Sequence, residues 1–188
     1  MIVKNIVKNA AMFLNLNDLL ETSLLGGSKT ADDVQTEEIN FLVACCNLVC
    51  NQVASEYITL TDTKSLTSTT GMISYPSISS KTIVDILKVK QNGVEVEFSC
   101  KPNRLETSPG DLEIVFAYQP LVSNINSTID FNNFKLSERV LSYGVVAEYC
   151  YIGGRYDDAT IWDNRFKTSL ININRPRREL KIKKRLWI

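Results

Sequence analysis

Hydrophobic residues between Thr36 and Tyr57 recur at the spacing of one helix face. This stripe comprises Ile39, Leu42, Val43, Cys46, Val49, Cys50, Val53, Ala54 and Tyr57. Most polar residues of the stretch fall outside the stripe, so the pattern predicts an amphipathic helix of about six turns. Asp33 and Thr36 are both candidate N-caps. Helix propensity alone stabilises such a segment only weakly, so we expect the rest of the chain to cover this apolar face.

Three other segments show helical spacing, at about 2–25, 136–152 and 157–172. The first carries lysines opposite its apolar face, which is typical of a first bundle helix and is also compatible with a targeting peptide. The segment 136–152 is apolar on most of its circumference. Such a helix lies in the middle of a bundle, or it faces both the core and a neighbouring subunit. Gly153 and Gly154 permit a tight reversal, so the last two helices are expected to be antiparallel.

Strand periodicity replaces helical spacing in the middle of the chain. Residues 94–98 and 112–118 place apolar side chains at every second position. Asn92 and Gly93 stand between the apolar run Ile83–Lys90 and the run Val94–Ser99, which predicts a β-hairpin. The Thr- and Ser-rich stretch 59–80 shows no such alternation, so the position of the first strand is left open.

These patterns predict an α+β protein that is mainly α. We expect a helical bundle with a small antiparallel β-sheet or hairpin inserted at about 59–120, and an extended C-terminal segment. A sheet of this size has one apolar face, which the helices are expected to cover. A chain of 188 residues can bury a sizeable core without disulfides or metals. We therefore expect one domain over residues 1–174, followed by the basic segment 175–188.

The chain contains no histidine, which narrows the functions that the sequence supports. Its absence removes the usual general base at neutral pH and the commonest metal ligand, so we expect neither an enzyme nor a metal or other cofactor. Cys45, Cys46 and Cys50 lack paired Cys-x-x-Cys spacing, and we interpret them as small hydrophobic residues in a reducing compartment. No apolar run is long enough to cross a bilayer, so no membrane partner is expected.

Charge is distributed unevenly along the chain although its formal net charge is zero. Residues 175–188 hold seven Lys or Arg and one Glu, which leaves 14 basic and 20 acidic residues in 1–174. The two parts therefore carry net charges of +6 and −6. Leu180 and Ile182 alternate with basic residues, so this segment is expected to be extended and able to add as a strand to a partner. A simple solvated end, docking on an acidic protein and contact with nucleic-acid phosphates all remain open.

The order of these parts resembles the head-to-tail adaptor proteins of tailed bacteriophages, which sit beneath the portal ring. The likeness lies in "SYPSISSKTIVDILKVKQNGVEVEF" at 74–98, "GDLEIVFAYQP" at 110–120 and "SYGVVAEYCYIGGRYDDATIWDNRFKTSL" at 142–170. It also includes the helical N-terminal half. The Thr/Ser-rich stretch 59–80 departs from the family pattern.

The resemblance implies a structural virion protein, made in the host cytoplasm, that forms a ring of twelve subunits in the neck of the virion. Such a ring extends the DNA channel, lets double-stranded DNA pass without specific binding, and receives the next tail or nozzle protein. By position, the portal-binding role falls on Arg175, Arg177, Arg178, Lys181, Ile182, Lys183, Lys184, Arg185, Leu186, Trp187 and Ile188. The predicted hairpin tip, Gln91, Asn92 and Gly93, points toward the tail side or the lumen. A nucleic-acid-binding protein that uses the same basic segment is the alternative.

Overall fold

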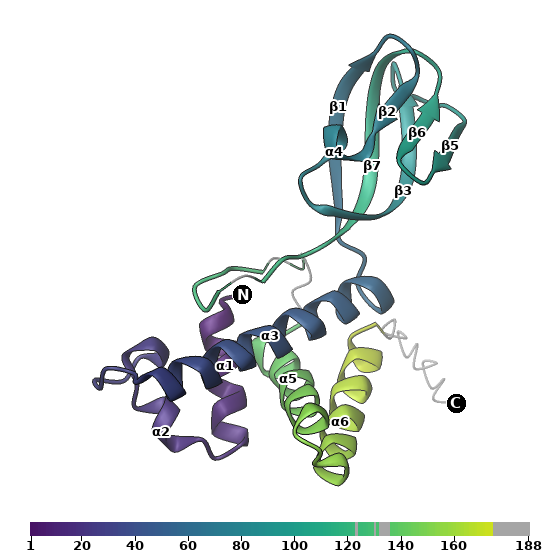
Figure 1. Cartoon of the computed structure of the whole chain (residues 1–188). Helices are drawn as coiled ribbons and strands as arrows, with labels where there is room; N and C mark the ends of the chain where they lie inside the picture. The colour runs from purple at the N-terminus through teal and green to yellow at the C-terminus, as the bar shows by residue number, and fades with distance from the viewer. Residues whose placement is uncertain (123, 130, 132–135, 175–188) are drawn as a thin grey trace, which may run out of the picture.

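The computed structural model describes residues 1–122, 124–129, 131 and 136–174. Its helices and strands form two parts, a helical body and a β module (Figure 1). The helical body comprises α1 (Val3–Phe13), α2 (Asn17–Leu20), the 3-10 helix η1 (Ser23–Leu25), α3 (Asp33–Glu56), α5 (Glu138–Ile152) and α6 (Tyr156–Asn174). The β module comprises β1 (Thr61–Ser68), β2 (Met72–Ser74), α4 (Tyr75–Ile78), β3 (Thr82–Gln91), β4 (Val94–Glu95), β5 (Phe98–Lys101), β6 (Arg104–Thr107) and β7 (Gly110–Gln119). No helix in the described ranges is long and apolar enough to cross a membrane.

The long helix predicted at 36–57 is confirmed as α3, and it begins three residues earlier. Its N-cap is Asp32, whose side chain accepts a hydrogen bond from the Gln35 backbone N–H, while the Gln35 side chain accepts one from the Asp32 N–H. This capping box satisfies two donors of the first turn, which explains why the helix starts before Thr36. The predicted stripe is buried from Ile39 to Ala54, and it packs against α1 and α5.

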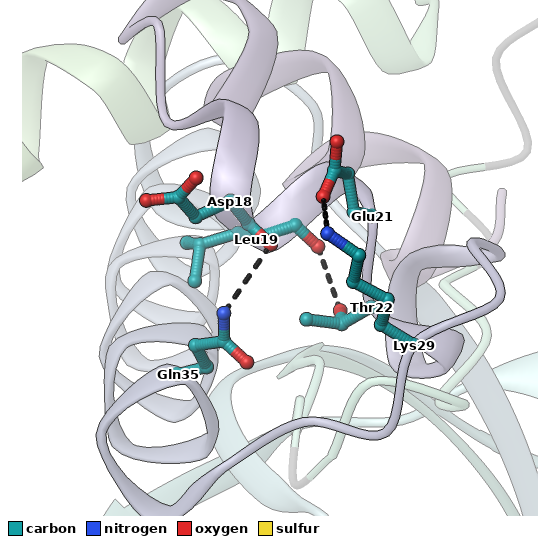
Figure 2. Close-up of polar contacts among 6 residues, drawn as sticks. All are labelled: Asp18, Leu19, Glu21, Thr22, Lys29 and Gln35. Atoms are coloured by element: carbon teal, nitrogen blue, oxygen red, sulfur yellow. Dashed lines mark hydrogen bonds and ion pairs between the residues drawn. The ribbon is translucent and has the colours of Figure 1, made fainter.

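The N-terminal segment 2–25 is divided into shorter elements. The chain turns at Asn15, which has a positive φ of 58°, and forms α1, α2 and η1 in succession. Figure 2 shows how this segment meets the start of α3. The Gln35 side chain donates to the Asp18 carbonyl, and the Thr22 hydroxyl, which is buried, donates to the Leu19 carbonyl at 2.6 Å.

Helix α5 lies in the middle of the helical body, as the apolar circumference of segment 136–152 allows. It packs against α1, α3 and α6, and Gly144 sits where the neighbouring helices come closest. A Cβ added at Gly144 would lie 2.8 Å from Val49 of α3 and 3.1 Å from Phe166 of α6. Glycine is therefore required here by close packing and not by a special backbone angle.

The predicted fold class is wrong in its proportions. The structure is 47% helical and 27% strand, with two antiparallel sheets, and is a mixed α+β fold and not a helical bundle with a small sheet or hairpin. One sheet has the order β1-β7-β3-β4 and the other β2-β6-β5. The strands that the sequence concealed are β1, β2 and β6. Most β1 side chains are exposed on both faces, so this strand shows no apolar alternation.

The β module has its own hydrophobic core, so the expectation that helices cover the sheet is also wrong. Its two sheets and α4 bury a common cluster: Ile73, Ile78, Ile86, Val89, Leu105, Leu112, Ile114 and Phe116. The helical body buries a separate and larger cluster. Tyr118 packs against both clusters, at the point where β7 meets the helical body. The extent of a single domain over 1–174 stays a prediction.

The hairpin predicted at Asn92 and Gly93 is confirmed between β3 and β4. Both residues have positive φ, 52° and 81°, as a tight two-residue turn requires. The strand expected over 94–99 is divided, because β4 ends at Glu95 and the chain then crosses to the second sheet at Phe98. The alternation of apolar and polar residues within 94–99 does not show that its two halves pair with strands of different sheets.

The packing of α5 predicts a clear cost for a larger side chain at Gly144. Gly144→Val should lower the free energy of unfolding by about 1–3 kcal/mol, because the valine methyl groups would overlap Val49 and Phe166. Thr168→Val, on the exposed face of α6, is the control and should change it by less than about 0.5 kcal/mol. Chemical denaturation of both variants measures the difference. Equal stabilities would show that α5 can move away from its neighbours.

Because the two parts have separate cores, a substitution can destabilise the β module without destabilising the helical body. Leu105→Ala should cost the β module about 2–5 kcal/mol, since Leu105 is fully buried in its cluster. Hydrogen exchange should then accelerate in β3, β6 and β7 while amides of α3 and α5 keep their protection. A uniform loss of protection across both parts would contradict the division into two cores.

Candidate assembly surface

The hairpin tip Gln91–Gly93 lies at the end of the β module that is distant from the helices. Strand β3 has ten residues, so the tip is roughly 30 Å from the end that adjoins the helical body. The Gln91 side chain donates a hydrogen bond to the Pro109 carbonyl at 2.9 Å, which ties the tip to the turn before β7. A Cβ at Gly110 would lie 2.2 Å from the Gln91 amide nitrogen, so only glycine leaves room for this contact.

A shallow hollow of about 400 Å³ adjoins this tip. It is lined by Ser65, Leu66, Thr67, Lys90, Asn92, Gly93, Asp111, Leu112 and Glu113. Asp111 accepts a hydrogen bond from the Thr67 hydroxyl at 2.6 Å, and Glu113 lies 3.9 Å from the Lys90 ammonium. These charges are of both signs and engage neighbours, so the hollow resembles a contact surface more than a site for one ion.

The junction of the two parts is formed by the chain around Leu60 and the end of β7. The Tyr118 N–H donates to the Leu60 carbonyl, and the Gln119 side chain donates to the Ser55 hydroxyl at 3.1 Å. Lys81 pairs with Asp62 at 2.7 Å and lies 3.9 Å from the centre of the Tyr118 ring. The hydrogen bond from Lys81 lowers the pKa of Asp62 below its usual value. The hydrogen bond from Gln119 to Ser55 joins the β module to the C-terminal end of α3, whereas Lys81, Asp62 and Tyr118 all lie within the module.

The basic segment assigned to portal binding, residues 175–188, lies outside the described residues. Helix α6 ends at Asn174, and Figure 1 shows this end below the C-terminal end of α3. The pKa of Lys167, two turns earlier, is raised mainly by its hydrogen bond with Asp163 and further by Tyr57.

The cysteines behave as the sequence predicts in one respect, because Cys45, Cys46 and Cys50 are buried. Burial raises the pKa of Cys45 to about 12, and the pKa of Cys50 is raised mainly by its contact with Cys46, whose sulfur lies 4.0 Å away. Such thiols stay protonated and poorly nucleophilic at neutral pH. Among the described residues, no group of three His, Cys, Asp or Glu side chains could hold a metal ion.

A groove of about 650 Å³ in the β module was not foreseen from the sequence. It separates the free side of β3 from α4 and the turn between β5 and β6, and it exposes Cys100. The Tyr75 hydroxyl donates to the Lys101 carbonyl at 2.7 Å across one wall. The local sequence gives no signal for this groove, because its walls come from strands of different sheets.

No protein-family model matches the chain, and a search of curated proteins also finds no match.

Burial predicts which thiols can react in the folded protein. A thiol reagent should label one cysteine per chain rapidly, Cys100, and the other four only after unfolding. Cys100→Ser should remove the rapid phase, whereas Cys150→Ser should leave it unchanged. Absorbance during titration with a disulfide reagent measures both phases. Rapid labelling of two or more thiols in the native protein would contradict the buried placement of α3 and α5.

Proposed function

We propose that this protein is a structural connector subunit of a tailed-bacteriophage virion, without enzymatic activity, that assembles as a ring beneath the portal. The observation that carries the proposal is the division of charge between the net −6 of residues 1–174 and the net +6 of 175–188. A basic segment on an acidic protein can bind the acidic surface of a neighbour. The resemblance of 74–98, 110–120 and 142–170 to head-to-tail adaptor proteins supports the same function.

The acidic charge of residues 1–174 suits a channel through which DNA must slide. Carboxylates repel DNA phosphates at short range, so a ring built from such subunits lets double-stranded DNA pass without holding it. A ring of twelve subunits, as in the adaptor proteins, would be located in the neck of the virion. The protein would be made in the host cytoplasm.

The two-part architecture gives each subunit separate faces for two neighbours. The end of α6 leads into 175–188, which we assign to the portal, whereas the tip Gln91–Gly93 lies roughly 30 Å along β3 from the junction. We assign the tip to the next tail or nozzle protein, or to the lumen. The tip is held by Gln91 on Pro109 and so presents Asn92 and Gly93 in one fixed turn.

The second candidate is a nucleic-acid-binding protein that uses the same segment, and the seven basic residues of 175–188 favour it. Neutralising six phosphates of a duplex would give an affinity that falls with log[salt] at a slope of roughly −5. Weak DNA binding with a flat salt response would remove this candidate.

Deleting residues 175–188 tests the proposed portal contact. The truncated protein should keep its circular dichroism spectrum and fail to join heads that carry a portal, because the deleted residues supply the attractive charge. The control replaces Thr168 by Val on the exposed face of α6, which should leave portal attachment unchanged. Completion of heads is scored by electron microscopy and infectivity. If truncated protein completes heads as well as the full chain does, the segment does not bind the portal.

A further inference from the structure

Strand β1 is an open edge of the four-stranded sheet. It pairs only with β7, and the register continues without a shift over eight residues, from Thr61 opposite Ala117 to Ser68 opposite Gly110. Side chains from Thr61 to Ser65 and at Thr67 are exposed, so nothing in the described part of the chain covers this edge. Figure 1 shows β1 along one side of the β module.

The backbone groups that face away from β7 can be identified from one hydrogen bond. The Thr63 N–H donates to the carboxylate of Asp62 at 2.8 Å and therefore does not point at β7. In an antiparallel ladder the N–H and C=O of a residue point to the same side, and the side alternates along the strand. The outward groups therefore belong to Thr61, Thr63, Ser65 and Thr67. Those of Ser65 and Thr67 have no backbone partner among the described residues.

The other strand edges of the β module are short or irregular. Strands β4, β2 and β5 have two, three and four residues, and the free side of β3 is interrupted by register shifts at Val84 and Leu87. Short edges and bulges are the usual means by which proteins prevent unwanted strand pairing. Of the described edges, β1 alone is both long and regular, which is the form that accepts an added strand.

The sequence 180–188 has the form of a strand that fits this edge. Its nine residues match the eight of β1 in length, and Lys181, Lys183 and Arg185 alternate with an apolar face. That apolar face comprises Leu180, Ile182, Leu186 and Ile188, with Lys184 as its exception, and Trp187 is the exception among the basic positions.

A strand added to β1 would have one face on the outer side of the sheet and one on the inner side, and these two sides differ in charge and burial. On the outer face of the sheet, β1 offers hydroxyls at Ser65 and Thr67, and their β7 partners are Glu113 and Asp111. The cations of this face, Lys88 and Lys90, lie beyond β7 on β3. Basic side chains next to β1 would adjoin these hydroxyls, and the carboxylates of Glu113 and Asp111, one strand further on, would attract them over a longer distance although Lys90 and Thr67 already contact them. On the inner face, half-buried Leu66 would meet the apolar side chains, and the exposed Asp62 and Lys64 of the same face would flank them.

We propose that residues 180–188 of one copy add as a strand to β1 of a second copy. Each copy then offers one edge and one strand, so the contact is head-to-tail and builds a chain or a closed ring of subunits. This inference rests on the proposed ring and narrows its portal assignment: residues 180–188 bind the neighbouring copy, and Arg175, Arg177 and Arg178 are left for the portal. The contact between copies forms without the portal, so the two proposals can fail separately.

The test uses the full chain and measures self-association by sedimentation velocity. Ile182→Pro removes an N–H from the donor segment, and Ser65→Pro removes an outward N–H of β1 that does not take part in pairing with β7. Each should weaken self-association by about tenfold or more. The controls Ile182→Val and Ser65→Ala keep the backbone N–H and should associate as the unaltered chain does.

A second measurement keeps the test valid if Ser65→Pro disturbs the β module. In the associated protein the Ser65 and Thr67 amides should exchange slowly, and dilution or Ile182→Pro should make them exchange at least tenfold faster. Reversing charge with Lys183→Glu and Arg185→Glu, away from the β module, should also weaken association. Unchanged association in Ile182→Pro, or a full chain that stays monomeric at all concentrations, would overturn the proposal.

Other outcomes are equally decisive. Slow exchange at Ser65 and Thr67 in a strictly monomeric protein would mean that the segment pairs within its own chain, which overturns the contact between copies. Association lost in Ser65→Pro and kept in Ile182→Pro would mean that a different segment occupies β1. If the chain self-associates as proposed and does not attach to portal-bearing heads, the inference stands and the proposed function fails. If the chain attaches to portal-bearing heads and does not self-associate, the proposed portal contact stands and the inference of a contact between copies fails.

Discussion

The burial of one face of α3 is the interaction on which the helical body depends. Its stripe from Ile39 to Ala54 lies against α1 and α5, and α5 in turn connects to α6 through the close contact at Gly144. An aromatic group links the same helices, since the Trp162 ring lies 5.2 Å from Phe13 and 5.6 Å from Tyr143. Because α3 also carries the β module at its C-terminal end, the position of the module follows from this packing.

The β module needs little from the helices for its own stability. Its sheets cover each other around Leu105 and Phe116, and it meets the helical body through Tyr118 and a few polar contacts near Leu60. A module with its own core can present a hairpin tip and an open strand edge at a distance from the helices. Such an arrangement suits a subunit that must contact several neighbours at once.

Segments with one buried face were predictable from sequence, and segments open to solvent on both faces were not. The α3 stripe and the alternation from Leu112 to Phe116 are strong signals because the alternate face is polar or small. Strand β1 gives no signal, since residues from Thr61 to Ser65 are exposed on both faces. The proportion of sheet was therefore underestimated, and the fold class was wrong.

In the candidate site, too, some features were predictable from the local sequence and others were not. The turn at Asn92 and Gly93 is encoded locally and was found, whereas the acceptor edge of β1 and the groove beside Cys100 depend on which strands pair across the chain. Pairing between distant strands is not visible in local periodicity. The two bulges of β3 conceal it further, because Val84 and Leu87 break the alternation of that strand.

Negative-stain imaging of the protein mixed with its own portal can show whether this chain is the ring-forming connector that we propose. We expect a ring of subunits, twelve in number, stacked on the narrow end of the portal, with a channel continuous through both. A portal that stays bare while the protein binds duplex DNA with a steep salt dependence would contradict the account and favour the nucleic-acid-binding alternative.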